Sequence, residues 1–157
     1  MFGLFRPAPL GVDLGTGSVK VIGLNGKKIS LAAFMDIPSS DWEDEAFLIK
    51  RLQNFFKEIN INGKDAVVHM PGHLSFVRTI NLPPMPKGEL KEAVKWEIKR
   101  QLPYPAEEAV YDYIATAVSD GIVVTFAAAE RKNVQRYISP FKEAGLKVVA
   151  VDVNPLC

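Results

Sequence analysis

The stretch Val12–Lys20 reads VDLGTGSVK and places small and polar side chains where an apolar run reverses direction. Gly15 and Gly17 admit backbone conformations that other residues avoid, and they let a ligand approach the main chain closely. Thr16 and Ser18 add hydroxyl donors. Successive backbone N–H groups in such a turn point into one concavity, which binds anions and phosphate above all. The pattern therefore predicts a phosphate-binding turn.

Two charged residues flank this turn. Lys20 would place its ammonium near phosphate oxygens as a point charge. Asp13 has the wrong sign to bind phosphate, but a carboxylate at a strand end suits a hydrated Mg²⁺ ion, which keeps most of its waters. The alternative is a hairpin turn that binds nothing, because short glycine-rich motifs are common. No Walker A loop occurs, and the motif opens a strand rather than the helix of a dinucleotide fingerprint.

The composition is typical of a globular protein without a strongly charged partner. Of 157 residues, 48% are hydrophobic and 24% charged, and the net charge of +1 does not point to nucleic acid or to an acidic membrane face. The single cysteine, Cys157, excludes an internal disulfide and a cysteine-based metal site within one chain. No apolar run approaches the roughly 20 residues that span a bilayer.

The first half of the chain predicts the strands that hold the turn. They cover Leu10–Gly15, Val19–Leu24 and Lys28–Ile37, and a fourth, buried strand covers Ala66–Met70. An amphipathic helix lies between the third and fourth strands, with Ser40 and Glu43 at capping-box spacing. Its apolar positions are Trp42, Ala46, Ile49, Leu52, Phe56 and Ile59.

The second half predicts two more helices and four more strands. The strands cover Ser75–Leu82, Val110–Val118, Ile122–Ala129 and Val148–Val153, with a helix over Lys87–Leu102 after the first of them. The apolar stripe of that helix comprises Leu90, Val94, Ile98 and Leu102, widened by Ala93 and Trp96. The last helix carries Val134, Tyr137, Ile138 and Phe141, and Pro140 inside it predicts a kink or a short first piece.

The resulting order, βββ-αβ-βαββ-αβ, predicts an α/β fold with a mixed sheet and helices on its face. The middle βαββ segment is bracketed by Pro71-Gly72 and by the last helix, so we expect it to form a small inserted subdomain. We place this subdomain at residues 74–129 and the main one at residues 1–73 and 130–157.

The turn motif, D-x-G-T-G-S-x-K between the first two strands of a meander, resembles the first phosphate loop of the actin-like ATPase superfamily. Within it, three stretches resemble PilM-like proteins of type IV pilus assembly: MFGLF…GVDLGTGSVKVIGL, FVRTINLPPMPKGELKEAVKWEIKRQLPYPAEEAVYDY and YISPFKEAGLKVVAVDVNPL. The resemblance covers nearly the whole chain, and its middle stretch is the most specific. It implies an actin-like (ribonuclease H-like) lobe with a subdomain inserted as in FtsA.

The resemblance also implies ATP and magnesium as cofactors, bound in a cleft between two lobes. The implied nucleotide-binding residues are Asp13, Gly15, Thr16, Gly17, Ser18 and Lys20, with Asp13 as the magnesium ligand. The second phosphate loop and adenosine pocket of such proteins have no counterpart in this sequence. We therefore expect the chain to represent the first lobe, to bind ATP weakly or not at all by itself, and to have no catalytic residue.

The family's partner is the short N-terminal cytoplasmic tail of PilN, an inner-membrane protein, which docks beside the inserted subdomain. An extended apolar peptide requires aromatic and aliphatic walls with backbone partners. The residues expected to bind it are Phe76, Arg78, Leu82, Trp96, Glu97, Tyr104 and Tyr113. Each of them is also compatible with a structural role, Trp96 in the core and Arg78 as a cross-strand partner.

Two further hypotheses compete with that of a cytoplasmic, membrane-associated adaptor lobe. One is a nucleotide hydrolase or sugar kinase of the same superfamily, and the other is an interaction module of cell division or type II secretion. His69 and His73 are expected to be core or turn residues, and Asp152 a hinge or cap residue. We also expect self-association through apolar surface near Val148–Leu156.

Overall fold

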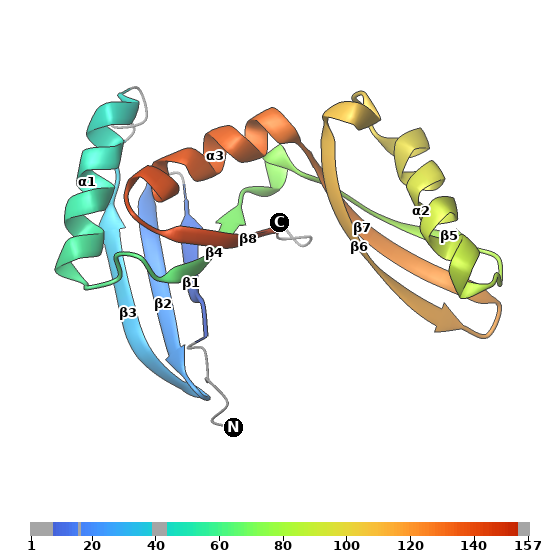
Figure 1. The fold of residues 1–157 in the computed structure, drawn as a ribbon, viewed down its shortest axis with the longest axis horizontal. Coiled ribbons are helices and arrows are strands. Elements are labelled where there is room, and N and C mark those ends of the chain that lie inside the picture. Colours follow the sequence, from blue (N-terminus) through green and yellow to red (C-terminus); the bar gives the residue numbers. More distant parts are fainter. Residues whose placement is uncertain (1–7, 16, 39–43, 154–157) are drawn as a thin grey trace. The chain divides into compact units, whose positions relative to one another are not determined.

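The computed structural model describes residues 8–15, 17–38 and 44–153, and within them the chain divides into two compact units. Unit 1 comprises residues 8–71 and 135–153, and unit 2 comprises residues 72–134. Figure 1 shows the helices and strands of both units. No helix among the described residues is long and apolar enough to cross a membrane.

Unit 1 is built on a five-stranded mixed sheet in the order β3-β2-β1-β4-β8. β1 and β2 are antiparallel, as are β2 and β3, whereas β1, β4 and β8 run parallel to one another. The sheet thus combines an N-terminal meander with two strands added by crossovers, as the order of elements predicted. The strands are β1 (Leu10–Leu14), β2 (Ser18–Asn25), β3 (Lys28–Asp36), β4 (Asp65–Met70) and β8 (Lys147–Val153).

Helix α1 (Glu45–Glu58) starts later than the sequence predicted. Asp44 is its N-cap, with its Oδ1 accepting a hydrogen bond from the backbone N–H of Phe47 at 3.0 Å. The capping box expected at Ser40 is therefore wrong, and the structure does not describe residues 39–43. The burial of Leu52 and Phe56 confirms part of the predicted stripe, but Ala46 is exposed and the helix also buries Leu48 and Phe55.

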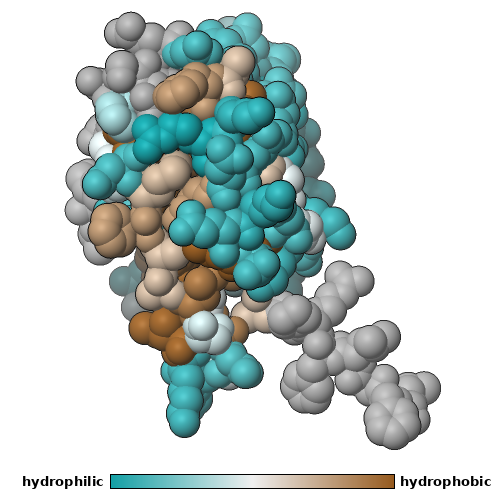
Figure 2. Space-filling model, turned by 90° about the vertical axis from the view of Figure 1, so that its left-hand side faces the viewer, coloured by the Kyte–Doolittle hydropathy of each residue, from teal (hydrophilic) through white to brown (hydrophobic). Residues whose placement is uncertain are grey.

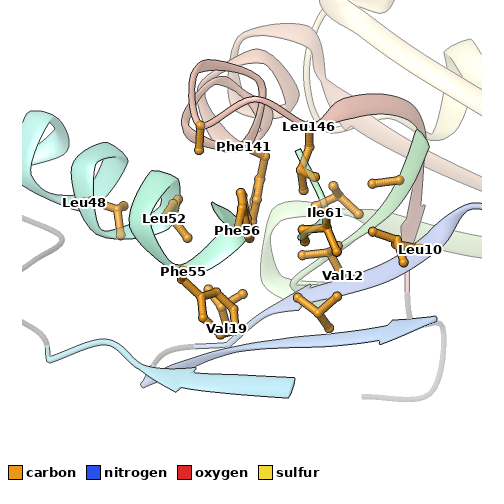
Figure 3. Packing of buried hydrophobic residues seen from close by; sticks show 14 of the residues in the cluster. Leu10, Val12, Val19, Leu48, Leu52, Phe55, Phe56, Ile61, Phe141 and Leu146 are labelled. Atoms are coloured by element: carbon orange, nitrogen blue, oxygen red, sulfur yellow. The ribbon is translucent and has the colours of Figure 1, made fainter. Parts of the chain in front are cut away.

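The core of unit 1 lies between the sheet and the helices α1 and α3 (Arg131–Glu143) (Figure 3). Phe56 from α1 and Phe141 from α3 are fully buried there with Val12 and Val19 of the sheet. Residues that alternate along each strand supply this face, as expected for a sheet covered on one side. Of the two outcomes predicted at Pro140, the short first piece is wrong, since α3 continues through this buried residue.

The other face of this sheet carries exposed apolar side chains. Ile22 and Leu24 on β2 are 44% and 45% exposed, and Phe34 on β3 is 70% exposed. On the side of unit 1 that carries α1 and β3, hydrophobic surface lies between hydrophilic regions (Figure 2). Val149 on β8 is 55% exposed, and it lies in the segment where we expected self-association.

Unit 2 is a three-stranded antiparallel sheet, ordered β5-β7-β6, with α2 packed on one face. Val94 and Ile98 of the helix and Val124 and Phe126 of the central strand are fully buried. Gly121 closes the β6–β7 hairpin where a Cβ atom would lie 2.3 Å from a backbone oxygen of β5, so only glycine fits. The elements are β5 (Phe76–Leu82), α2 (Lys87–Gln101), β6 (Ala109–Val118) and β7 (Gly121–Glu130).

Candidate functional site

The predicted phosphate-binding turn joins β1 to β2 at one end of the unit 1 sheet. The N–H of Gly15 donates to the carbonyl of Ser18 at 2.9 Å, which closes the turn. The carbonyl of Gly17 accepts from the N–H of Ile37 at 2.8 Å, so the turn is also tied to the end of β3. Thr16 lies outside the described residues. Hydrogen bonds therefore fix the described part of this turn at Gly15 and at Gly17.

The two glycines of the turn are not required by the packing around them. A Cβ atom on Gly15 would lie 3.5 Å from the Ser18 oxygen, an ordinary contact, and one on Gly17 would meet nothing within 4 Å. The φ angle of Gly15 is not in the left-handed region, so the turn does not use the conformational freedom of glycine at this position. The space over the turn is open, and this leaves close approach of a ligand as the role that glycine can serve.

Asp13 and Lys20 face each other across β1 and β2, because the two residues are directly paired in the sheet. The Nζ atom of Lys20 lies 3.4 Å from Oδ2 of Asp13, and both side chains are well exposed. An exposed pair of this kind stabilises the fold by less than about 1 kcal/mol. The pair can therefore open at little cost, which leaves the ammonium and the carboxylate available for a phosphate and a metal ion.

The strand register continues this polar row onto β4 and β8. Asp13 is paired with His69, and His69 is paired in turn with Asp152. Residues paired across neighbouring strands project to the same face, so all four side chains share the face that α1 and α3 do not cover. Oδ1 of Asp152 accepts a hydrogen bond from the N–H of Val153 at 2.9 Å.

This row borders a hollow of about 520 Å³ on that face of the sheet. Asp13, Lys20, His69 and Asp152 contribute its polar part. Within the described chain, no cluster of three or more histidine, cysteine or acidic residues is placed to hold a metal ion. A magnesium ion here would have to use few protein carboxylates and complete its shell with water and phosphate oxygens. The apolar part of the lining includes Gly11, Ile22, Ala32, Phe34 and Val67.

Sequence reasoning did not include His69 and Asp152 among the site residues. Both were assigned structural roles, whereas the register places them beside Asp13 in the lining of the hollow. The signal that was available is their position at the carboxyl ends of two predicted strands. Parallel strands bring such ends to one edge of a sheet, where ligands bind in open α/β folds.

The residues expected to bind a partner peptide all lie in unit 2, and three of them form one group. The guanidinium carbon of Arg78 lies 4.5 Å from the ring centroid of Phe76, and its Nη1 donates to the carbonyl of Val77 at 2.9 Å. Phe126 lies between Arg78 and Tyr113 in the register of the sheet, and its ring centroid is 6.0 Å from that of Phe76. Phe126 is fully buried, so the group presents the half-buried rings of Phe76 and Tyr113 with the exposed Arg78 beside them.

Trp96 and Glu97 lie on α2 rather than on the strands. Trp96 is 71% exposed, and its ring has the Nζ atom of Lys99 6.0 Å away. The prediction that Trp96 widens the buried stripe is wrong, because it is two residues from the fully buried Val94 and projects to the opposite side of the helix. Glu97 accepts a hydrogen bond from Arg100 at 2.9 Å.

Leu82 and Tyr104 are more enclosed. Leu82 is 8% exposed and belongs to the core of unit 2. The hydroxyl oxygen of Tyr104 is buried and has no hydrogen-bond partner among the described residues. Burial raises the pKa of Tyr104, and the negative charge of Glu130 raises it further. A buried donor without a partner is uncommon in folded proteins, so this hydroxyl is an exception within the described chain.

The class of protein follows from the sheet and the turn together. In this mixed sheet, the first strand pairs with an antiparallel meander on one side and with parallel strands on the other. An acidic residue precedes the glycine-rich first turn. These features define the actin-like, ribonuclease H-like lobe that the sequence predicted. The chain belongs to a particular family of this class, described as type IV pilus assembly protein PilM, whose family model matches residues 11–156.

Solved structures show the same similarity. A structure of a PilM-PilN type IV pilus biogenesis complex matches 96% of this chain with 27% sequence identity and a TM-score of 0.80. The chain spans 48% of the length of that match, so it corresponds to about half of its relative. No curated protein sequence matches the chain.

A second similar structure comes from another secretion machine. It is the cytoplasmic domain of EpsL, an inner membrane component of the type II secretion system of Vibrio cholerae, with a TM-score of 0.63 and 11% identity. The match covers 92% of this chain and 56% of the other. At this identity it shows a similar fold and nothing further.

Proposed function

We propose that this chain acts in type IV pilus assembly as the first lobe of a PilM-like protein on the cytoplasmic face of the inner membrane. The observation that carries the proposal is the match, at a TM-score of 0.80 over 96% of the chain, to a structure of a PilM-PilN complex. Membership of the PilM family over residues 11–156 supports the same process. The lobe is then an adaptor that binds a membrane-bound partner and is not by itself an enzyme.

The partner in this proposal is the N-terminal tail of a PilN-like inner-membrane protein, and it binds unit 2. β5 lies at an edge of its sheet, so one row of its backbone groups is available to an extended peptide. Phe76 and Arg78 on this strand supply an aromatic face with a cation beside it. An extended apolar segment with carbonyl groups fits this chemistry.

The turn of unit 1 contributes one half of a nucleotide site in the same proposal. Gly15 and Gly17 leave room for phosphate oxygens, Lys20 supplies a positive charge and Asp13 holds a hydrated magnesium ion. Stabilising a triphosphate requires donors arranged around its terminal phosphate on more than one side. We therefore expect these residues alone to bind Mg-ATP weakly and not to hydrolyse it.

Calorimetric titration tests both parts of the proposal. A synthetic peptide with the N-terminal sequence of a PilN protein should bind the 157-residue chain without nucleotide, and a scrambled peptide should not. Failure of the native peptide to bind would remove the adaptor function. Binding of Mg-ATP at micromolar concentration would contradict the half-site. In that case Asp13→Asn should abolish the binding, whereas Asp120→Asn in an exposed hairpin turn should not.

A further inference from the structure

β6 is a long strand at the edge of the unit 2 sheet (Figure 1). It pairs with β7 along its full length, from Ala109 to Val118, without a bulge or a shift of register. Its other side has no neighbouring strand in this sheet. A straight edge strand of this length presents a row of backbone groups that can pair with another chain.

Two hydrogen bonds identify the backbone groups that face this open edge. The N–H of Tyr113 donates to Oδ1 of Asp112 at 2.8 Å, and the carbonyl of Ala109 accepts from Arg131 at 3.3 Å. The side-chain partners at these two groups indicate that the groups face the open edge rather than β7. Because backbone groups alternate between the two edges of a strand, the odd-numbered residues of β6 face outwards. These residues are Ala109, Tyr111, Tyr113, Ala115 and Ala117.

The other edge strands carry features that disfavour pairing with a long strand of a second copy, although β5 remains accessible to a short peptide. The register shifts between β2 and β3 at Gly23/Leu24 and between β4 and β8 at Ala66/Val67. β5 has only seven residues, includes Arg78 and is followed directly by Pro83-Pro84. β6, by contrast, contains no proline, glycine, lysine or arginine, and Asp112 is its single charge. Natural edge strands are usually protected by such residues or bulges.

β6 also carries exposed apolar side chains. Ile114 is 76% exposed, the largest value among the exposed large hydrophobic residues that the structure describes. Val118 is 49% exposed and Tyr111 is 39% exposed. Isolated apolar residues on a surface are ordinary, but three on one unpaired edge strand indicate a surface that is covered by another strand.

We propose that β6 pairs with β6 of a second copy of this chain, antiparallel and with the two-fold axis at Ile114. Ile114 then lies opposite its own counterpart. Asp112 lies opposite Thr116, whose hydroxyl can donate to the carboxylate, and Val110 lies opposite Val118. No like charges meet in this register. A pairing centred on Asp112 would place the two carboxylates directly opposite each other, which is unfavourable.

The same register fits the other face of the strand. Tyr113 lies opposite Ala115, and Tyr111 lies opposite Ala117, so each large side chain meets a small one. These odd-numbered pairs are also the ones whose backbone groups face the open edge, so they form the hydrogen-bonded pairs of the new ladder. Side-chain size, charge and hydrogen-bond direction therefore all favour the antiparallel pairing centred on Ile114. This pairing joins two three-stranded sheets into one sheet of six strands.

Asp112 limits this association. Its carboxylate occupies the N–H of Tyr113, one of the groups that must bond to the second copy. Pairing therefore requires this bond to exchange for one across the interface. Asp112→Ala removes this competitor together with the acceptor for Thr116, so the two effects oppose each other. Ile114→Lys places two like charges opposite each other at the axis, and we expect the dissociation constant to rise at least about tenfold.

Single cysteines test the register directly, in a Cys157→Ser background. Residues of a non-hydrogen-bonded antiparallel pair have Cα atoms about 4.5 Å apart, within the range for a disulfide. Ile114→Cys should therefore form a covalent dimer on mild oxidation. Thr116→Cys should not, because it lies opposite Asp112 of the second copy. Asn81→Cys on β5 is the matched control from the opposite edge of the same sheet.

Sedimentation velocity over a range of concentrations completes the test. The chain should show a monomer–dimer equilibrium that Ile114→Lys weakens, and circular dichroism should confirm that this exposed substitution leaves the fold intact. A strict monomer would overturn the proposal, as would a dimer in which Thr116→Cys or Asn81→Cys crosslinks as well as Ile114→Cys. Binding of a PilN peptide along β6 in place of the second copy would also overturn it.

Discussion

Arg78 on β5 offers the sharpest test of how unit 2 recognises a peptide. Its guanidinium lies over the ring of Phe76 at 4.5 Å, and one of its N–H groups bonds to the neighbouring carbonyl of Val77 at 2.9 Å. The side chain is exposed, so it can turn towards a ligand. The perturbation is Arg78→Ala, with Arg100→Ala on α2 as a matched control, since Arg100 is 75% exposed and its ion pair is with the nearby Glu97.

Arg78→Ala should change the free energy of unfolding and the free energy of peptide binding by different amounts. An exposed cation over an aromatic ring stabilises a fold by about 0.5–1 kcal/mol, so Arg78→Ala should cost no more than that in the free energy of unfolding. A charged donor bonded to a peptide carbonyl contributes about 1.5–3 kcal/mol to binding. The dissociation constant of the peptide should therefore rise about tenfold to 150-fold, because every 1.4 kcal/mol is a factor of ten.

Isothermal titration with a PilN peptide measures the dissociation constant, and thermal unfolding measures the stability of the fold. Arg100→Ala should leave both unchanged, and Arg78→Lys should restore part of the affinity because it keeps the charge but loses the planar stacking. An unchanged dissociation constant for Arg78→Ala, with wild-type stability, would refute the assignment of Arg78 to the peptide site.

Three further predictions concern local features of the fold. Gly17→Ala should leave the melting temperature within a few degrees of wild type, because nothing lies within 4 Å of the added Cβ atom. Gly121→Ala should unfold unit 2 at a clearly lower temperature, because its Cβ atom would lie 2.3 Å from a backbone oxygen. Equal melting temperatures of the two variants would contradict this prediction. Asp44→Ala removes the N-cap of α1 and should lower the free energy of unfolding by about 1 kcal/mol in urea titrations, and no loss would mean that the helix is capped elsewhere. The pKa of Tyr104 is raised in the folded chain, so the unfolded chain loses its phenol proton first, near pH 10.0. The stability due to the neutral phenol is therefore complete below that pH and declines as the pH rises above it. Unfolding followed across this range should show that Tyr104→Phe loses less stability than wild type, and parallel curves would contradict the prediction.

Local patterns in the sequence were sufficient to predict the strands and the helix α2. Alternating apolar residues mark β2 and β4, and the spacing of Leu90, Val94 and Ile98 marks α2, because these periods match the geometry of the elements. The start of α1 was not predicted correctly, since Ser40 and Asp44 both suit an N-cap and only the packing of the helix decides between them.

The candidate site was predicted only where it is local in sequence. Asp13 and Lys20 are seven residues apart and share one hairpin, so the motif alone brings them together. His69 and Asp152 reach Asp13 through parallel pairing of strands that are far apart in the chain, and no short motif records that register. Trp96 was expected to widen the buried stripe of α2, although a residue two positions from Val94 and from Ile98 lies on the opposite face of the helix.

Backbone NMR of the chain during titration with a PilN peptide tests the central claim most directly. The account predicts that amide resonances of residues 76–82 and their neighbours in unit 2 shift with the peptide concentration, in the absence of nucleotide. Shifts confined to unit 1, or a spectrum that the peptide leaves unchanged, would contradict it.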